Sequence, residues 1–123
     1  MAFQTKTSGT IVDDNTVGTD VWTNPTNAAL SDGAYTVANG LLDAETHYLN
    51  CQNFGFGIPV TGTVTGVVVD IEKKRTSGIL NCVDKFVRLI TNNAVAGNDK
   101  ADTVTNWATS DTTVTYGAAS DNW

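Results

Sequence analysis

Side chains with strong chemistry are scarce in this sequence. Its 123 residues include one histidine, two cysteines and two prolines. A single histidine and two cysteines far apart cannot supply the four ligands of a closed zinc site. Two cysteines are also too few for a disulfide framework. We therefore expect Cys51 and Cys82 to be buried free thiols, with a bridge between their strands as the alternative.

Charged side chains are also few and mostly of one sign. They make up 16% of the chain, the net charge is −6 and the sequence pI is about 4.3. An acidic surface repels phosphates and anionic lipid headgroups, so neither nucleic acid nor a membrane is an expected partner. The sequence has no signal peptide and no apolar run as long as a membrane span, which predicts a soluble product made in the cytoplasm.

Threonine, valine, asparagine and glycine are abundant. Thr (20 residues) and Val (14) favour the half-buried surface of a sheet, while Asn (12) and Gly (11) favour turns. Short alternating runs separated by turns predict an all-β fold, an antiparallel β-sandwich or jelly roll. We expect residues 1–19 to form an N-terminal arm or edge strand, and residues 20–123 to form a single domain.

The strongest single pattern predicts one long central hairpin over about residues 63–91. An alternating run over 63–72 is followed by a Thr-Ser-Gly reversal and a second run over 79–91. Apolar residues on both faces predict that the hairpin is covered on both sides, as at a sheet–sheet or subunit contact. The predicted interface residues are Val67, Val69, Ile71, Phe86, Val87, Ile90 and Trp123.

Weaker patterns predict short strands elsewhere. Residues 46–54 alternate and favour a strand, although 41–50 also fits a helix face. Trp107 is expected to anchor the loop-rich segment 92–111. The other predicted strands lie at 11–12, 21–23, 34–38 and 112–116.

Carboxylates and His47 are the only candidates for catalysis. His47 has no nucleophile elbow near it and is expected on a strand surface. Asp70, Glu72 and Asp84 could approach one another as glycosidase carboxylates do. The competing interpretation is cross-strand ion pairing, because Lys73 and three other basic residues are interleaved with them. We expect ion pairing, no catalytic residue and no enzymatic activity.

Calcium is the best metal candidate, and no other cofactor is expected. Asp13, Asn15 and Asp20 supply oxygen ligands around a glycine turn. The pattern departs from an EF-hand at Val17 and lacks the closing glutamate. The alternative is that these residues only form local Asx turns.

Several short blocks resemble a β-sandwich module of tailed-bacteriophage virion proteins. They occur in order and cover roughly residues 20–123. The blocks are Trp22–Ala28, Ser31–Tyr35, Tyr48–Leu49, Asn53–Pro59, Thr63–Val67, Trp107–Asp111, Thr113–Gly117 and Ser120–Trp123.

The resemblance implies a non-enzymatic structural part of a virion: a capsid decoration or head-fibre protein, or a tail appendage. Its expected partners are copies of itself, with a trimer favoured, and other virion proteins. Similar modules continue past the Ser120–Trp123 block, which leaves two alternatives: the further strands are absent from this chain, or a neighbouring subunit completes the sheet by strand exchange. The alternative is a carbohydrate- or receptor-binding module of a tail fibre that contacts a host-surface glycan through exposed aromatic residues.

Overall fold

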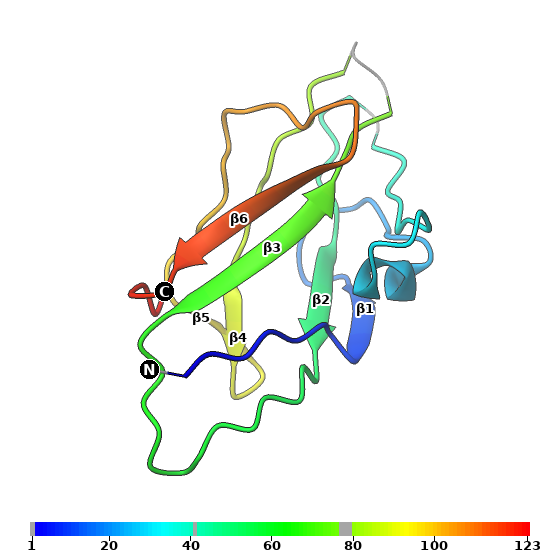
Figure 1. Ribbon diagram of the computed structural model, residues 1–123. Coiled ribbons are helices and arrows are strands. Elements are labelled where there is room, and N and C mark those ends of the chain that lie inside the picture. The colour runs from blue at the N-terminus through cyan, green and yellow to red at the C-terminus, as the bar shows by residue number, and fades with distance from the viewer. Residues whose placement is uncertain (1, 41, 77–79) are drawn as a thin grey trace. The chain divides into compact units, whose positions relative to one another are not determined.

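Short antiparallel strands form nearly all the regular structure of the chain. The computed structural model describes residues 2–40, 42–76 and 80–123, which fall into two units, Met1–Val60 and Thr61–Trp123 (Figure 1). The described residues contain three separate two-stranded sheets, one 3-10 helix and no α-helix. The prediction of an all-β chain is therefore confirmed. No helix in these residues is long and apolar enough to cross a membrane.

In the first unit, β1 (Thr10–Asp14) pairs with β2 (Tyr48–Gln52). Ile11, opposite Cys51, is 4% exposed and is the one buried apolar residue described in this unit. The strand predicted over residues 46–54 is confirmed in its central part. Cys51 and Cys82 are both free thiols, as expected, and burial raises the pKa of each.

A close backbone crossing joins two loops of this unit. The N–H groups of Thr19 and Asp20 donate to the Glu45 carbonyl, and the His47 N–H donates to the Asp20 carbonyl. Gly18 permits this crossing because its φ is +66° and a Cβ there would lie 2.2 Å from the Thr46 carbonyl oxygen. The crossing fixes the position of His47.

The strands predicted at 21–23 and 34–38 are reduced to one isolated bridge, between Thr23 and Val37. The chain turns into the 3-10 helix η1 (Pro25–Ala29) directly after that bridge. Asn24 has a left-handed backbone conformation, and proline is well placed at the first helical position. This turn shortens the predicted strand.

The second unit is built on a ribbon of β3 (Val67–Lys73) and β6 (Thr112–Ala118). Val69 lies opposite Tyr116 and Ile71 lies opposite Val114. Burial alternates along β3, with Val67, Val69 and Ile71 on the more buried face. Three of the predicted interface residues therefore share one face of this strand.

The predicted central hairpin over residues 63–91 is wrong in its pairing. β3 pairs with β6, and β4 (Leu89–Thr91) pairs instead with β5 (Ala94–Ala96). No strand occurs in the described residues between β3 and β4; the predicted reversal and the start of its return strand lie partly at 77–79, outside the described residues.

Local turn chemistry explains the pairing of β4 with β5. Asn92 and Asn93, which join the two strands, both have positive φ, as a type I′ hairpin turn requires. The segment that precedes β4 is held by the 99–107 loop through separate backbone bonds. It is therefore not available to pair with β3.

Candidate functional site

A buried aspartate is the polar centre of the second unit. Asp84 is 6% exposed, and its two carboxylate oxygens accept four hydrogen bonds. Oδ1 accepts from Lys73 Nζ at 2.5 Å and from Trp107 Nε1 at 2.8 Å. Oδ2 accepts from the Tyr116 hydroxyl at 2.6 Å and from the Asp102 N–H at 3.1 Å. The carboxylate is therefore fully paired although it is buried.

The β3–β6 ribbon brings two of these partners together. Lys73 is the last residue of β3 and Tyr116 lies within β6, both on the inward face of the ribbon. Lys73 Nζ also donates to the Tyr116 hydroxyl. Asp84 itself comes from the irregular segment after β3.

The 99–107 loop holds that irregular segment in place. The Trp107 N–H donates to the Cys82 carbonyl at 2.7 Å, and the Asp84 N–H donates to the Asp102 carbonyl at 3.2 Å. The Lys100 N–H donates to the Val87 carbonyl at 2.9 Å. Trp107 therefore anchors its loop, as the sequence predicted, through both its backbone and its indole.

Electrostatics keep the centre charged at neutral pH. Burial alone would raise the pKa of Asp84, but the hydrogen bonds from Lys73, Tyr116, Trp107 and the Asp102 backbone together lower it. Burial and the Asp84 carboxylate both raise the pKa of Tyr116, so the phenol stays protonated. Hydrogen bonds from the Thr105 side chain and the Thr105 and Val104 N–H groups lower the pKa of Asp102 to about 2.

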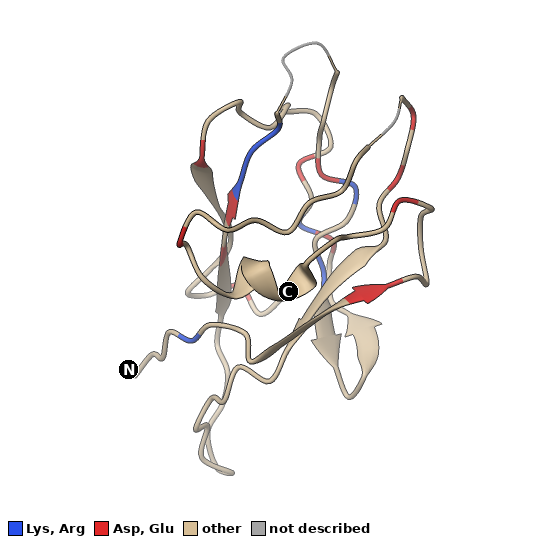
Figure 2. Cartoon of the chain, turned by 90° about the vertical axis from the view of Figure 1, so that its right-hand side faces the viewer, with Lys and Arg blue, Asp and Glu red and all other residues tan. Residues whose placement is uncertain are grey.

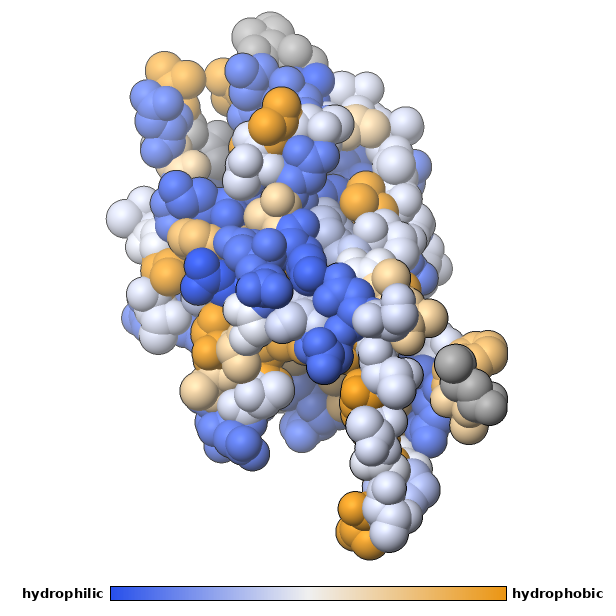
Figure 3. Space-filling view, turned by 90° about the vertical axis from the view of Figure 1, so that its left-hand side faces the viewer, coloured by the Kyte–Doolittle hydropathy of each residue, from blue (hydrophilic) through white to orange (hydrophobic). Residues whose placement is uncertain are grey.

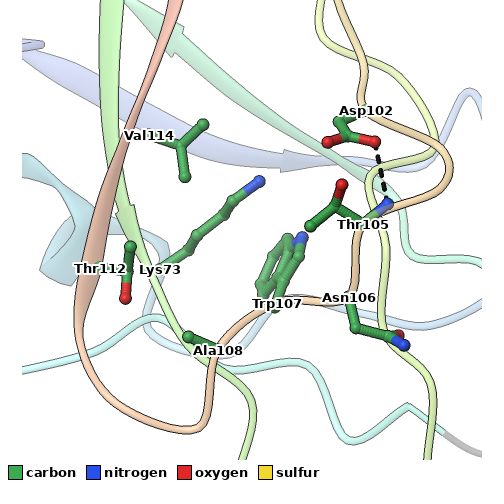
Figure 4. Close-up of a pocket in the computed structure, with 8 residues that line it drawn as sticks. All are labelled: Lys73, Asp102, Thr105, Asn106, Trp107, Ala108, Thr112 and Val114. Atoms are coloured by element: carbon green, nitrogen blue, oxygen red, sulfur yellow. Dashed lines mark hydrogen bonds between the residues drawn. The ribbon is translucent and has the colours of Figure 1, made fainter.

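A small pocket of about 210 Å³ opens beside this centre. Figure 4 shows the Lys73 side chain extending into it, with its amino group between Val114 and the Trp107 ring. This volume is below the range of about 300–1,000 Å³ usual for small-molecule sites. The Asn106 amide is already bonded to Cys82 N and Asn81. The lining residues are Lys73, Asp102, Thr105, Asn106, Trp107, Ala108, Thr112 and Val114.

The three acidic residues considered for glycan cleavage do not converge. Asp70 and Glu72 lie on the exposed face of β3, where Asp70 accepts a hydrogen bond from the Thr115 hydroxyl at 2.6 Å. Asp84 is bonded to Lys73, whose side chain is on the opposite, inward face. The carboxylates therefore form no pair across a common cleft. Ion pairing of Asp84 with Lys73 does occur, but inside the unit and not on a wet face.

The first unit has a second polar cluster, which is half-buried and centred on Asp13. Its Oδ2 lies 2.7 Å from His47 Nδ1, and its Oδ1 accepts the Trp22 N–H at 2.8 Å. The Trp22 indole N–H donates to the His47 carbonyl at 2.8 Å. His47 was expected on a strand surface, but its side chain is only 12% exposed and it precedes β2.

The calcium candidates are engaged in different ways. Asp13 is bonded to His47 and Trp22, Asn15 is exposed, and Asp20 Oδ2 is a buried atom without a hydrogen-bond partner. No cluster of three or more His, Cys, Asp or Glu side chains suited to a metal occurs among the residues the structure describes.

The predicted interface residues occupy several environments of the second unit. Phe86 and Val87 are half-buried in the segment before β4, and Ile90 is 36% exposed in β4. Trp123 is 8% exposed and its indole N–H donates to the Val67 carbonyl at 2.9 Å. Most of its ring is therefore used within its own unit.

Comparison of the chain with protein-family models, with curated proteins and with solved structures found no match in any of the three.

Proposed function

We propose that this chain is a non-enzymatic structural subunit of a tailed-bacteriophage virion, a capsid decoration or head-fibre protein or a tail appendage. It is made in the host cytoplasm and assembles as a homo-oligomer, with a trimer favoured, on other virion proteins. The sequence blocks between Trp22 and Trp123 support the virion assignment. The large exposed surface and the open strand edges support the proposed assembly.

The observation that carries this proposal is the large surface left open by one chain. A folded monomer of this mass is expected to expose about 6,300 Å², and two separate units of half the mass about 7,700 Å². This 13.0 kDa chain exposes 8580 Å². Only Ile11, Tyr116 and Trp123 are buried among the described apolar side chains. Contact with further copies would remove such surface from water.

Exposed apolar side chains occur in both units. Figure 3 shows hydrophobic residues open to solvent on one face, interspersed with hydrophilic ones. In Figure 2 most of the ribbon carries no charged residue, so few charges would be desolvated on assembly. The largest exposed fractions belong to Val60, Phe3, Val104 and Leu42.

Open strand edges support assembly through backbone pairing. Among the described residues β3 and β6 pair only with each other, so each seven-residue strand has a second edge with no described strand beside it. Isolated two-stranded ribbons are marginally stable, and open edges favour pairing with another chain. We propose that strands of neighbouring copies complete these ribbons into a β-sandwich or jelly roll.

Glycan binding is the second candidate. Phe54 and Phe56 stack with ring centroids 5.8 Å apart and are 36% and 47% exposed, which makes a platform for a sugar ring. The neighbouring Gln4 side chain is already bonded to the Gly57 backbone through both its amide nitrogen and its oxygen. A sugar would have to find its polar partners elsewhere. A glycan array distinguishes this candidate from the first.

The composition of purified particles tests the virion assignment. We expect the chain in protease-treated, density-purified phage particles, at a fixed ratio to the major capsid protein when its peptides are quantified by mass spectrometry. Its presence in infected cells with absence from the particles would contradict the proposal. A soluble host protein measured in the same samples controls for carry-over.

A further inference from the structure

Lys73 and Asp84 form an ion pair that is unusually well enclosed. Their side chains are 9% and 4% exposed, and Lys73 Nζ lies 2.5 Å from Asp84 Oδ1. The ammonium also lies 4.9 Å from the Trp107 ring centroid and 5.1 Å from that of Tyr116. The amine is therefore held beside the carboxyl carbon in a site that excludes most water.

We propose that Lys73 and Asp84 condense without an enzyme to form an intramolecular isopeptide bond, an amide between Lys73 Nζ and Asp84 Cγ. The bond would tie the end of β3 to the irregular segment that precedes β4. This inference concerns the chain itself and does not depend on where the protein acts.

The ion pair already contains every atom of the products. An ammonium and a carboxylate give one amide and one water molecule. The new bond joins nitrogen to the carboxyl carbon, one carbon–oxygen bond breaks, and two protons of the ammonium leave with the departing oxygen. Nothing is oxidised or reduced, and no other reactant is needed.

The Tyr116 hydroxyl is placed to move the first proton. It accepts a hydrogen bond from Lys73 Nζ and donates one to Asp84 Oδ2 at 2.6 Å. A proton can pass from the ammonium to the hydroxyl oxygen while the hydroxyl's own proton passes to Oδ2. The result is a neutral amine beside a neutral carboxylic acid, with no phenolate formed. Oδ2 is then the oxygen that leaves as water.

The Trp107 indole and the enclosed geometry of the pair also favour the reaction. The Trp107 indole N–H stays on Oδ1, where negative charge develops when the amine attacks Cγ. Burial among aromatic rings opposes the charge on Asp84, but its hydrogen bonds outweigh this effect and lower its pKa, so the relay has to supply the neutral pair transiently. The fold holds the amine and the carboxyl group in one geometry, so they need not meet by diffusion. In well-oriented intramolecular reactions this is equivalent to an effective concentration of about 10⁵–10⁸ M.

A second ion pair of the same unit provides a matched control. Lys100 Nζ lies 2.7 Å from Asp121 Oδ2, but these side chains are 23% and 34% exposed. The Tyr116 hydroxyl bridges Lys73 and Asp84, whereas the further bond described for the Asp121 carboxylate is the one it accepts from the Trp123 N–H. We expect this pair to remain unlinked.

The mass of the purified wild-type chain decides whether the bond exists. We expect an intact mass lower than the sequence mass by one water molecule. After trypsin digestion, the peptides that carry Lys73 and Asp84 should remain joined, whereas those that carry Lys100 and Asp121 should separate. Fragmentation of the joined peptides excludes water loss at Asp32-Gly33, which cyclisation of the aspartate could also produce. An intact mass equal to the sequence mass would overturn the proposal.

Two variants test the assigned roles. Lys73→Arg keeps the positive charge but removes the amine, so it should show the full sequence mass. Tyr116→Phe keeps both reacting groups and should form the bond at least about tenfold more slowly after synthesis. An unchanged rate in Tyr116→Phe would overturn the relay. If either variant fails to fold, the wild-type mass and its linked peptides still decide whether the bond forms.

Discussion

At the scale of single residues, hydrogen-bonded aspartates help to hold each unit together, as apolar side chains do in most protein cores. In each unit one carboxylate accepts a hydrogen bond from a tryptophan: Asp13 from the Trp22 backbone and Asp84 from the Trp107 indole. A partner with a basic side chain, His47 or Lys73, completes each group. Such networks specify a geometry because a buried polar group without its partner is costly.

The Asp13 group makes folding stability depend on pH. Hydrogen bonds from His47 and from the Trp22 N–H lower the pKa of Asp13 from its ordinary value of 3.8. A carboxyl whose pKa is lowered by folding stabilises the fold above its unfolded pKa, and this stabilisation is lost as pH falls through the folded value. Asp13→Asn should therefore be less stable than wild type at pH 7, with a difference that shrinks below about pH 4.

Chemical unfolding followed by tryptophan fluorescence at several pH values measures this difference. Asp43→Asn is the matched control, because Asp43 is exposed in the same unit and has a left-handed backbone that asparagine also accepts. The control should match wild type throughout. A stability loss in Asp13→Asn that is equally large at pH 3 and pH 7 would contradict the assigned role.

Sequence reasoning singled out some residues of both polar clusters but not their arrangement. It named Asp13 as a candidate calcium ligand, Asp84 as an ion-pair partner and Trp107 as an anchor. The contact of Asp13 with His47 joins residues 34 positions apart, and that of Asp84 with Tyr116 joins residues 32 apart. No local pattern encodes such a contact, because it depends on which strands pair.

At the scale of elements, alternation identified β2, β3 and β6 but not their partners, and it missed β5, which lies in the segment expected to be loop-rich. Residues 67–73 and 112–118 both alternate, and both are strands in the structure. A period of two determines which side chains share a face and says nothing about the neighbouring strand. Proximity in the sequence therefore favours the apolar run over residues 79–91 as the partner of β3, which the structure contradicts. The Asn92-Asn93 turn was the local signal that would have paired that run with β5.

An engineered cysteine pair tests the β3–β6 register. In a chain with Cys51→Ala and Cys82→Ala, Asp70→Cys combined with Thr115→Cys should oxidise readily to a disulfide, because these positions are directly opposite. Free-thiol titration and non-reducing mass analysis follow the reaction.

The control combines Asp70→Cys with Thr113→Cys. Thr113 lies on the same face of β6 but opposite Glu72, so it is diagonal to Asp70 and too distant for an unstrained bridge. Oxidation of the control pair as fast as the test pair would show that the assigned register is wrong.

At the scale of the whole molecule, the chain has more open surface and open strand edge than a self-sufficient monomer of its length. In the part of the chain that the structure describes, apolar residues are only partly covered and each sheet has two strands. Composition anticipated the all-β class and the sparse charge. It could not anticipate how little of the apolar surface one copy would bury, since burial depends on the partners of each strand. The proposed assembly would account for both features together.

The mass of the purified protein in solution tests this central claim most directly. Size-exclusion chromatography with multi-angle light scattering should give a mass about three times the 13.0 kDa of one chain, with unfolding that shifts to higher temperature as protein concentration rises. A particle of 13.0 kDa that keeps this mass at every concentration, and that melts in one concentration-independent cooperative transition, would contradict the account.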